Sequence, residues 1–555
     1  MKREGFNSLY EKSFKENWEL QALTDYDGTT LCYKDVVASI AKLHILFNEC
    51  KLHRGDKVAI CGRNQSNWGV VFLAALTYGA VAVPILHEFK PDNIHHIVNH
   101  SDAQLLFVSK SIWENLNEDA MPEINATIAL ADFSIQHSKN PQLYKLNNTL
   151  NDIFNKKYSN GISQKDIHFY KDKPNDLALI SYTSGTSGNS KGVMLPFRSI
   201  KANVQFAEFI LPLFTRGGRL VSMLPMAHMY GLCFEFLFGM CVGAHMHFLT
   251  RLPTPKIIME AFSRIKPTLI ISVPLIIEKI YKKQLLPVLE KTSIKMLLKL
   301  PLIDKVLLMK IKNTLDKVFG GEFIEIVVGG AAFSKDAEQF FKRIGFRYTV
   351  GYGMTECGPL ISYEQWDRTA LYSCGKPLPN LKVMIDSTDP MNISGEILVK
   401  GDNVFLGYYK NKEASKDCFT KDGWFRTGDM GTLDDKGNLY IRGRCKTMIL
   451  GPSGQNIYPE EIEDLLNSYP YVLESLVIEQ QDGKLAALIY PDYEAALADN
   501  INENDIPKLL DESLKHINNE LPHYSQIAYT KIVFDEFEKT PKRSIKRYLY
   551  QVPKE

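Results

Sequence analysis

The cysteines of this sequence lack the spacing of a zinc site or of a redox motif. Nine of them are scattered over 555 residues, and no two are arranged as C-x-x-C. Zinc fingers and thioredoxin-like proteins need such closely spaced thiols. A chain of this length can bury large cores and needs no metal or disulfide to fold. We therefore expect free thiols in a reducing compartment.

The sequence also lacks a long apolar run and an excess of either charge. Its most apolar stretches, 269–277 and 232–244, are shorter than the ~20 residues that span a bilayer, and residues 1–8 lead into no apolar signal sequence. Sixty-five basic residues face 64 acidic ones, for a formal charge of +1. Nucleic-acid-binding proteins usually carry a marked basic excess. These observations predict a soluble, cytoplasmic protein without a nucleic-acid partner.

Internal repeats and low-complexity tracts are missing as well, and the order of apolar segments indicates the fold class. β-Branched runs such as 57–61 and 105–108 alternate with amphipathic segments such as 68–78 and 92–99. This alternation predicts α/β units around mostly parallel sheets. After about residue 370, short strands follow one another, and residues 434–438 are typical of a hairpin turn. A β-rich part is therefore expected there.

The most informative segment, residues 182–193, follows an apolar strand at 177–180 and is rich in glycine and hydroxyl side chains. Such a loop brings backbone N–H groups close to an anion, and Lys191 adds a charge suited to phosphate. It is not a Walker A loop, because Ser190 rather than glycine precedes the lysine. A flexible surface loop is the alternative interpretation. The candidate phosphate contacts are Thr183, Ser184, Gly185, Thr186, Ser187, Gly188 and Lys191.

Six further motifs follow this loop, at residues 224–231, 329–332, 351–356, 423–429, 443–446 and 454–463. Together the seven motifs resemble the signatures of the adenylate-forming (AMP-binding) superfamily, which includes acyl-CoA synthetases, peptide-synthetase adenylation domains and luciferases. The resemblance implies an α/β protein with a large N-terminal domain, residues 1–445, of two α/β layers plus a distorted β-barrel, with a β-rich subdomain at about 370–445. It also implies a small, mobile α+β lid domain, residues 447–555, and a hinge at Lys446.

Enzymes of this superfamily join a carboxylate to AMP, release pyrophosphate and pass the acyl group to a thiol. Because both reactants are anions, the site must neutralise charge and hold them in line. By resemblance Glu356 holds Mg²⁺, a hard cation that prefers oxygen ligands, and Thr355 contacts phosphate. His228 is expected beside the carboxylate and the α-phosphate, although a histidine in an apolar run is more often structural.

The same resemblance implies the nucleotide contacts. Tyr352, followed by Gly353, offers a flat face for adenine, and Asp429 accepts hydrogen bonds from the ribose hydroxyls. The remaining expected contacts are Gly330, Ala331 and Ala332 beside the purine, Arg444 at ribose or phosphate, and Asn456 at the α-phosphate.

The sequence departs from the superfamily pattern near its C-terminus. That pattern is roughly Lys-Thr-Pro-x-Gly-Lys-Ile, and its last lysine reaches the carboxylate during adenylation. Here Ser544 stands at that position, with Lys542 and Lys546 two residues away on either side. A shift of two keeps the same face of an extended segment, so either lysine is a candidate catalytic residue. A catalytically impaired nucleotide- or acyl-binding protein is the alternative that Ser544 supports.

Residues 272–281 and the helical insert after them resemble the long-chain fatty acyl-CoA synthetase branch. We therefore expect an AMP-forming ligase of lipid metabolism that uses ATP, Mg²⁺ and CoA with a medium- or long-chain fatty acid. An acyl–acyl carrier protein synthetase or a fatty acyl-AMP ligase stays open, because the motifs do not fix the acceptor. An apolar acid also suits the side chains expected near the pocket: Met226, Met229, Leu232, Phe234, Phe236 and Phe238.

Lysines and apolar residues are interspersed through the insert at 282–317, where acidic residues are sparse. This pattern is typical of a helix on a membrane surface. It predicts peripheral contact with an inner membrane surface rich in anionic lipid. An ordinary helix that packs its apolar face on the domain is the alternative.

Overall fold

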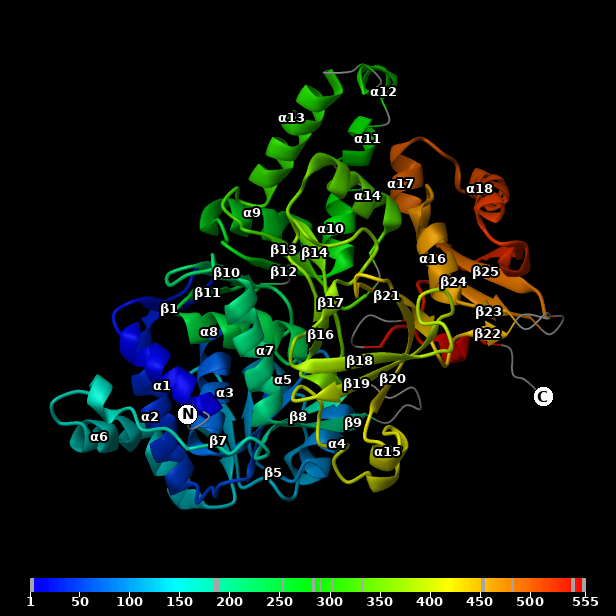
Figure 1. Ribbon diagram of the computed structural model, residues 1–555. Helices are drawn as coiled ribbons and strands as arrows, with labels where there is room; N and C mark the ends of the chain where they lie inside the picture. The colour runs from blue at the N-terminus through cyan, green and yellow to red at the C-terminus, as the bar shows by residue number, and fades with distance from the viewer. Residues whose placement is uncertain are drawn as a thin grey trace.

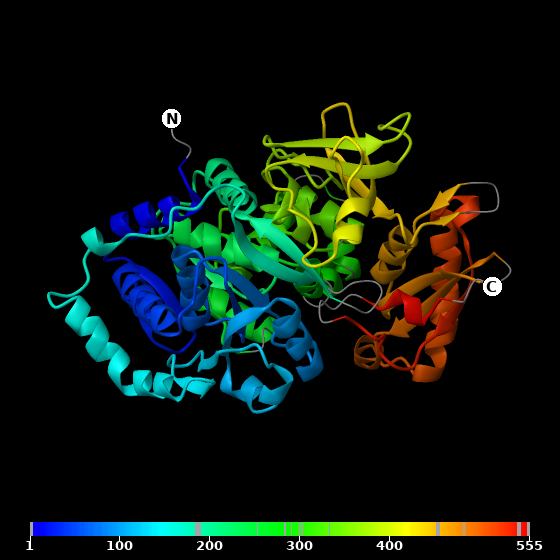
Figure 2. The ribbon, with the colours of Figure 1, turned by 90° about the horizontal axis from the view of Figure 1, so that it is seen from below.

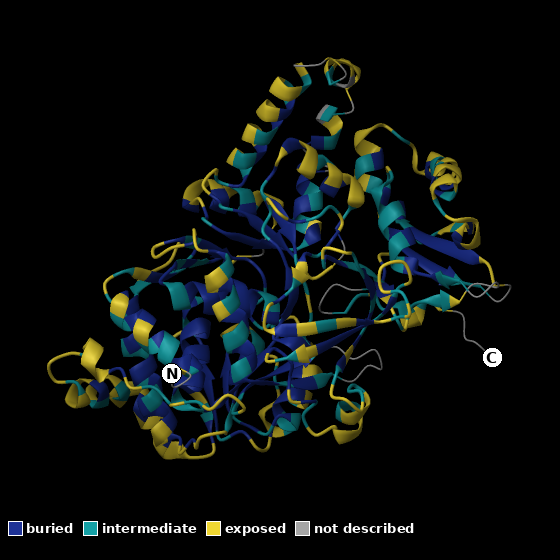
Figure 3. Ribbon diagram, viewed as in Figure 1, coloured by how far each residue is buried: buried dark blue, intermediate teal, exposed yellow. Residues whose placement is uncertain are grey.

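The computed structural model describes residues 4–183, 190–251, 254–281, 285–289, 291–298, 300, 303–331, 333–450, 455–480, 483–540 and 545–551. Across these ranges the chain has the α/β architecture that the sequence predicts (Figure 1). Buried residues follow the strands and the inner faces of the helices, and exposed residues follow their outer faces (Figure 3).

The first part of the chain is built on a seven-stranded sheet with the order β7-β6-β5-β3-β4-β8-β9. The five inner strands are parallel, and the two edge strands are antiparallel to their neighbours. The strands are β3 (Lys57–Cys61), β4 (Val81–Ile85), β5 (Ala103–Val108), β6 (Ala126–Ala129), β7 (Ile135–Ser138), β8 (Leu177–Thr183) and β9 (Lys191–Pro196). The helices of this part are α1 (Phe6–Glu16), α2 (Tyr33–Glu49), α3 (Ser66–Tyr78), α4 (Pro91–His100), α5 (Lys110–Trp113), α6 (Leu146–Lys157) and α7 (Phe197–Ile210). The predicted strands at 57–61 and 105–108 and the helices at 68–78 and 92–99 are confirmed.

The second α/β layer contains two smaller sheets. The first has the order β10-β11-β1-β2, and the second is a parallel sheet, β12-β13-β14. Their strands are β1 (Gln21–Asp25), β2 (Thr30–Cys32), β10 (Arg219–Ser222), β11 (His245–Phe248), β12 (Ile270–Ser272), β13 (Ile326–Val328) and β14 (Tyr348–Val350). The helices are α8 (Phe238–Val242), α9 (Pro255–Ile265), α10 (Pro274–Ile280), α11 (Leu286–Leu289), α12 (Thr292–Leu297), α13 (Ile303–Val318) and α14 (Lys335–Ile344). A π-helix, Gly231–Leu237, leads into α8.

The β-rich part predicted after about residue 370 is present, and it begins earlier, at Tyr352. A three-stranded antiparallel sheet is followed by a four-stranded one, β18-β19-β20-β21, with α15 (Lys412–Asp417) beside it. The strands are β15 (Tyr352–Gly353), β16 (Leu360–Tyr363), β17 (Lys376–Pro377), β18 (Leu381–Asp386), β19 (Gly395–Gly401), β20 (Phe425–Leu433) and β21 (Leu439–Arg444). The Gly437 N–H donates to the Asp434 carbonyl over 3.0 Å, which confirms the expected hairpin turn between β20 and β21.

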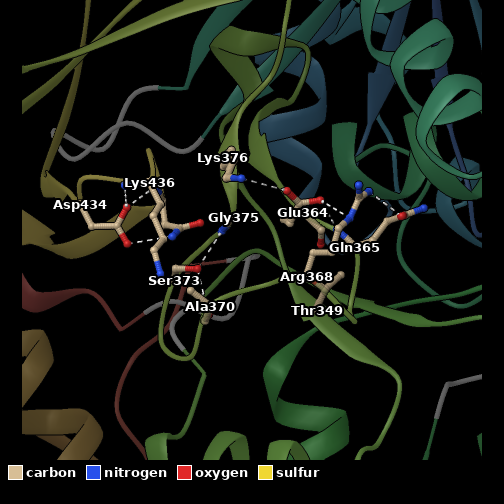
Figure 4. Close-up of polar contacts among 11 residues, drawn as sticks. Thr349, Glu364, Gln365, Arg368, Ala370, Ser373, Gly375, Lys376, Asp434 and Lys436 are labelled. Atoms are coloured by element: carbon tan, nitrogen blue, oxygen red, sulfur yellow. Dashed lines mark hydrogen bonds and ion pairs between the residues drawn. The ribbon is translucent and has the colours of Figure 1, made fainter.

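The loop between β16 and β17 is held by a polar brace centred on Glu364 (Figure 4). The Glu364 carboxylate lies 3.3 Å from Arg368 Nε and 3.7 Å from Lys376 Nζ, and the Thr349 hydroxyl donates to the Glu364 carbonyl over 2.6 Å. The brace fixes the strands that directly follow the Glu356 turn.

The C-terminal part forms a separate lobe (Figure 2). It contains β22 (Ile449–Leu450), β23 (Asn456–Ile457), α16 (Pro459–Ser468), β24 (Val472–Glu479), β25 (Leu485–Pro491), α17 (Tyr493–Ala498), α18 (Ile506–Glu520) and β26 (Ile527–Ile532). Its two hydrophobic clusters contain only residues from Ile449 onward. Within the ranges given above, none of the helices combines the length and the apolar character that crossing a membrane requires.

Candidate active site

The predicted phosphate loop connects the antiparallel strands β8 and β9, in which Thr183 pairs with Lys191. These two residues therefore flank the loop at the edge of the large sheet. The other candidate contacts, Ser184, Gly185, Thr186, Ser187 and Gly188, lie outside the described residues.

Lys191 and Glu356 converge on one aromatic side chain, Tyr408. The Tyr408 hydroxyl donates to Glu356 Oε1 over 3.0 Å, and Lys191 Nζ lies 4.9 Å from the centre of the Tyr408 ring. Burial and the adjacent Glu356 carboxylate raise the pKa of Tyr408, so its hydroxyl stays a donor. The predicted phosphate-binding lysine and the predicted metal ligand are thus neighbours.

Backbone pairing explains how Tyr408 reaches this position. The segment 406–409 runs along β9, with hydrogen bonds of 2.9 Å from the Leu406 N–H to the Met194 carbonyl and 2.8 Å from the Tyr409 N–H to the Gly192 carbonyl. The Phe405 N–H donates to the Glu356 carbonyl over 2.9 Å. The sequence analysis missed Tyr408, one of 26 tyrosines, because nothing local distinguishes it.

A tight turn places Thr355 and Glu356 after β15. A Cβ atom at Gly353 would lie 2.2 Å from the Pro359 carbonyl oxygen, so only glycine fits. Thr355 begins a single 3₁₀ turn that ends at Cys357. Glu356 is buried, and the Cys357 thiol behind it is fully buried. Burial first, and then the Glu356 and Asp429 carboxylates, raise the pKa of Cys357 well above its ordinary value.

The predicted ribose contacts also lie together. Asp429 and Arg444 pair across β20 and β21, with Arg444 Nε 2.8 Å from Asp429 Oδ1. The Tyr352 hydroxyl donates to the other oxygen, Asp429 Oδ2, over 2.6 Å. Burial raises the pKa of Asp429, against the opposing effects of Arg444 and Tyr352. One buried carboxyl group therefore joins Tyr352 and Arg444, which are predicted to contact adenine and ribose.

Gly330 and Ala331 follow β13 and are exposed, as a backbone platform for a purine requires; Ala332 lies outside the described residues. Beneath them, the Tyr230 hydroxyl donates to the Val327 carbonyl over 3.0 Å, and a Cβ atom at Gly329 would lie 3.1 Å from the Tyr230 ring. The His228 motif and the Gly330 motif are therefore in direct contact.

His228 is half-buried in a turn, where its N–H donates to the Pro225 carbonyl over 2.9 Å. The apolar side chains predicted near the acyl pocket are buried beside this turn in one hydrophobic cluster. Phe236 packs against Phe248 and Phe238 packs against Phe214, all in the hydrophobic core.

Three predicted residues belong to the hinge region and the C-terminal lobe. Lys446 is exposed in the turn after β21. Asn456 Nδ2 donates to the Tyr458 hydroxyl over 3.3 Å, and Tyr458 contacts Ser394 of the large part. Lys546 Nζ lies 2.9 Å from Glu538 Oε2, while Lys542 lies outside the described residues. In the described structure, no hydrogen bond or ion pair connects Asn456 or Lys546 to Glu356 or Asp429.

This arrangement can bind a nucleoside triphosphate and act on its α-phosphate. It has a cation and a small-residue loop for phosphate, an aromatic face and a carboxyl group for the nucleoside, and a carboxylate for a divalent ion. Glu356 fits a hard cation, because its partner Tyr408 is neutral and, among the described residues, no lysine or arginine is ion-paired with it.

Family models match nearly the whole chain. The model described as AMP-binding enzyme matches residues 10–409, and the model described as AMP-binding enzyme C-terminal domain matches residues 446–551. Among curated proteins, the chain is 26% identical over 543 residues to the long-chain-fatty-acid–CoA ligase FadD15 of Mycobacterium bovis, covering 89% of this chain and 86% of that protein. It is 28% identical over 497 residues to the long-chain-fatty-acid–CoA ligase 5 of Rattus norvegicus, covering 80% and 69%.

Solved structures share the fold. ATP-bound MatB from Rhodopseudomonas palustris superposes with a TM-score of 0.75 at 23% identity, covering 98% of both chains. The anthranilate CoA ligase AuaEII in complex with anthranoyl-AMP superposes with a TM-score of 0.78 at 18% identity, covering 98% of this chain and 96% of that one.

Proposed function

The chain belongs to the AMP-binding enzyme family, and from this premise we propose that it is an ATP-dependent fatty acyl-CoA synthetase. The enzyme joins a medium- or long-chain fatty acid to AMP, releases pyrophosphate, and transfers the acyl group to CoA. The observation that carries the proposal is the convergence of Lys191 and Glu356 on Tyr408. The bacterial and mammalian relatives named long-chain-fatty-acid–CoA ligases support the choice of acid.

We propose the following roles for the side chains. Lys191 and the loop before it bind the β- and γ-phosphates, and Thr355 adds a hydroxyl contact. Glu356 holds Mg²⁺, which when bound neutralises phosphate charge. Tyr352 faces the adenine, and Asp429 with Arg444 binds the ribose. These contacts hold the α-phosphate in line with the carboxylate of the fatty acid, which lies beside His228.

The C-terminal lobe acts in this proposal as a lid that turns about Lys446. Its hydrophobic clusters contain no residue of the large part, so it can move as a unit. Its polar contacts to the large part include an exposed pair, Arg442 with Glu461 at 3.5 Å, and a surface ion pair of this kind contributes about 1 kcal/mol or less. Rotation therefore breaks no hydrophobic core.

Hydroxylamine trapping with acids from C2 to C18 tests the proposed function. We expect ATP-dependent hydroxamate from C8 to C18 acids at about ten times the rate seen with acetate or more, because an apolar pocket gains about 1 kcal/mol or so per methylene. A second stage offers CoA or holo-acyl carrier protein to the acyl-AMP formed, and we expect thioester with CoA. Absence of hydroxamate with every acid contradicts the synthetase, and thioester with carrier protein alone selects the alternative acceptor.

Helices α12 and α13 are proposed to contact an anionic membrane surface, from which the fatty acid is drawn. One face of α13 packs on the domain through Leu308, Ile311 and Leu315. A second apolar set points outward, with Val306 71% and Met309 63% exposed. Both helices project from the rest of the molecule (Figure 1). Apolar residues that are exposed beside lysines are the pattern of an interfacial helix.

Sedimentation with vesicles tests this contact. The double variant Val306→Ser/Met309→Ser is expected to reduce binding to phosphatidylserine vesicles at low salt about thirtyfold, because about 1 kcal/mol is lost for each of the two apolar side chains withdrawn from the interface. Leu497→Ser is the matched control, since Leu497 is 77% exposed on α17 of the C-terminal lobe. If the unaltered protein fails to sediment with anionic vesicles at low salt, the membrane proposal is wrong.

A further inference from the structure

Glu235 is a carboxyl group in the interior of the large part, with 0% of its surface exposed. It lies in the π-helix Gly231–Leu237, a rare form that is frequent at functional sites. In the described structure it forms no ion pair with a lysine, arginine or histidine. A buried carboxyl group without a cation costs several kcal/mol, and an apolar residue of similar size would avoid that cost. Its presence must therefore be explained by what it binds.

The Glu235 carboxyl group accepts hydrogen bonds from two backbone N–H groups just after β10. The Met223 and Leu224 N–H groups each donate to it over 3.3 Å. Strand β10 ends at Ser222, so these groups have left the sheet that would otherwise pair them. A buried N–H group without a partner costs about 1–3 kcal/mol. The Glu235 carboxyl group thus supplies the hydrogen-bond acceptor that a neighbouring strand would otherwise provide.

Asn64 holds the same segment from another side. It lies in the turn between β3 and α3, where its Nδ2 donates to the Leu224 carbonyl over 2.6 Å and to the Ser222 hydroxyl over 3.0 Å. Its Oδ1 accepts from the Met226 N–H over 2.9 Å. The side-chain amide therefore pairs with the backbone of 224–226 as a strand would.

The segment held in this way, residues 222–226, leads directly into the His228 turn. The His228 N–H donates to the Pro225 carbonyl, so the backbone of the His228 turn is continuous with the segment that Asn64 and Glu235 fix. The turn that follows the segment is packed against the Gly330 motif, because Tyr230 lies in close contact with Gly329. Displacement of 222–226 would therefore move the His228 motif against the Gly330 turn.

We propose that Asn64 and Glu235 are positioning residues, which hold residues 222–226 from two sides and so keep His228 in register with the reacting carboxylate and α-phosphate. This inference rests on the proposed function. Neither residue touches the substrates; both act through the backbone of one irregular segment.

The kinetic test uses Glu235→Leu, Asn64→Ala, the double variant and Glu235→Gln. Burial raises the pKa of Glu235 well above its ordinary value, so the neutral glutamine mimics its protonated form. We expect Glu235→Leu and Asn64→Ala each to lower kcat/KM for the fatty acid about tenfold or more, with KM for ATP within about twofold of the unaltered enzyme. Glu235→Gln should retain the rate within about twofold, and the double variant should lose less than the product of the single losses.

A second arm needs no turnover and separates this inference from the proposed function. Amide hydrogen exchange of peptides covering 222–230 should quicken in both variants, because Glu235→Leu removes the acceptor of the Met223 and Leu224 N–H groups and Asn64→Ala removes that of the Met226 N–H group. Asn7→Ala is the matched control, because buried Asn7 bonds the Leu76 and Tyr170 carbonyls over 3.0 Å in another part of the molecule. It should lower the melting temperature while leaving exchange at 222–230 and acid kinetics unchanged.

The outcomes distinguish failure of the positioning role from failure of the proposed function. The positioning role is overturned if exchange at 222–230 is unchanged, if Glu235→Gln fails as badly as Glu235→Leu, or if the acid kinetics match those of Asn7→Ala. If the unaltered protein turns over no acid at all, the proposed function fails, while the exchange arm still shows whether the two side chains hold the segment.

Discussion

Replacement of Glu356 by alanine is expected to lower the rate of acid-dependent pyrophosphate release about 10²–10³-fold. Removal of one electrostatic group that acts on charge developing in the transition state typically costs about 2.7–4 kcal/mol, which corresponds to this range. The loss should be in kcat and in the dependence on Mg²⁺, because the carboxylate is the proposed metal ligand. Pyrophosphate release measured across a Mg²⁺ titration gives both quantities.

Two variants serve as controls for the Glu356 result. Tyr408→Phe removes only the hydroxyl that donates to Glu356 Oε1, so its effect should be about tenfold or less. Glu364→Ala removes another buried acid of the same region, the centre of the brace between β16 and β17, and should reduce stability without changing the half-maximal Mg²⁺ concentration. A Glu356→Ala enzyme within about threefold of the normal rate at every Mg²⁺ concentration contradicts the assignment.

The double variant Lys542→Ala/Lys546→Ala is expected to lose about a hundredfold or more in acyl-AMP formation. In a charge-assisted reaction between two anions, the removal of a positioned cation acts on the transition state. Thioester formation from acyl-AMP supplied ready-made should stay within about threefold, because in this superfamily it uses the other face of the lid. Separate assays of pyrophosphate release and of thioester formation measure the two half-reactions.

The single variants show which lysine reaches the carboxylate. Lys546 is held by Glu538 next to an antiparallel bridge between Lys539 and Ile545, so Lys546 acts only if it leaves that carboxylate. Lys539→Ala is the matched control, since it removes a nearby lysine that is paired with Glu474 at 2.8 Å. Full activity in both single variants and in the double variant would exclude a catalytic lysine in this segment.

Structural features that depend on one short segment could be predicted from the sequence. The strand before the phosphate loop, the hairpin at 434–438 and the α/β class follow from local patterns of apolar residues and turns, and the structure has them. Three separate motifs predict Tyr352, Asp429 and Arg444 as contacts of one nucleoside. In the structure Asp429 contacts both of the other side chains.

Residues whose role depends on pairing across the fold could not be found in this way. Tyr408 reaches Glu356 because residues 406–409 run beside β9, and no local pattern gives that register. The role of Glu235 could not be predicted either, because its partners, the Met223 and Leu224 N–H groups, lie beyond the end of β10 and reach it only in the folded chain.

The buried thiol of Cys357 matters for chemical self-protection. An acyl-adenylate is a mixed anhydride and reacts readily with thiolates, and Cys357 directly follows the carboxylate at which Mg²⁺ is proposed to bind. The attacking species is the thiolate rather than the thiol, and here the complete burial of the side chain raises the pKa of Cys357 and keeps the proton on sulfur. The protein can therefore make an acylating agent beside one of its own cysteines without becoming its target, so acyl groups are kept for the thiol that enters from solution.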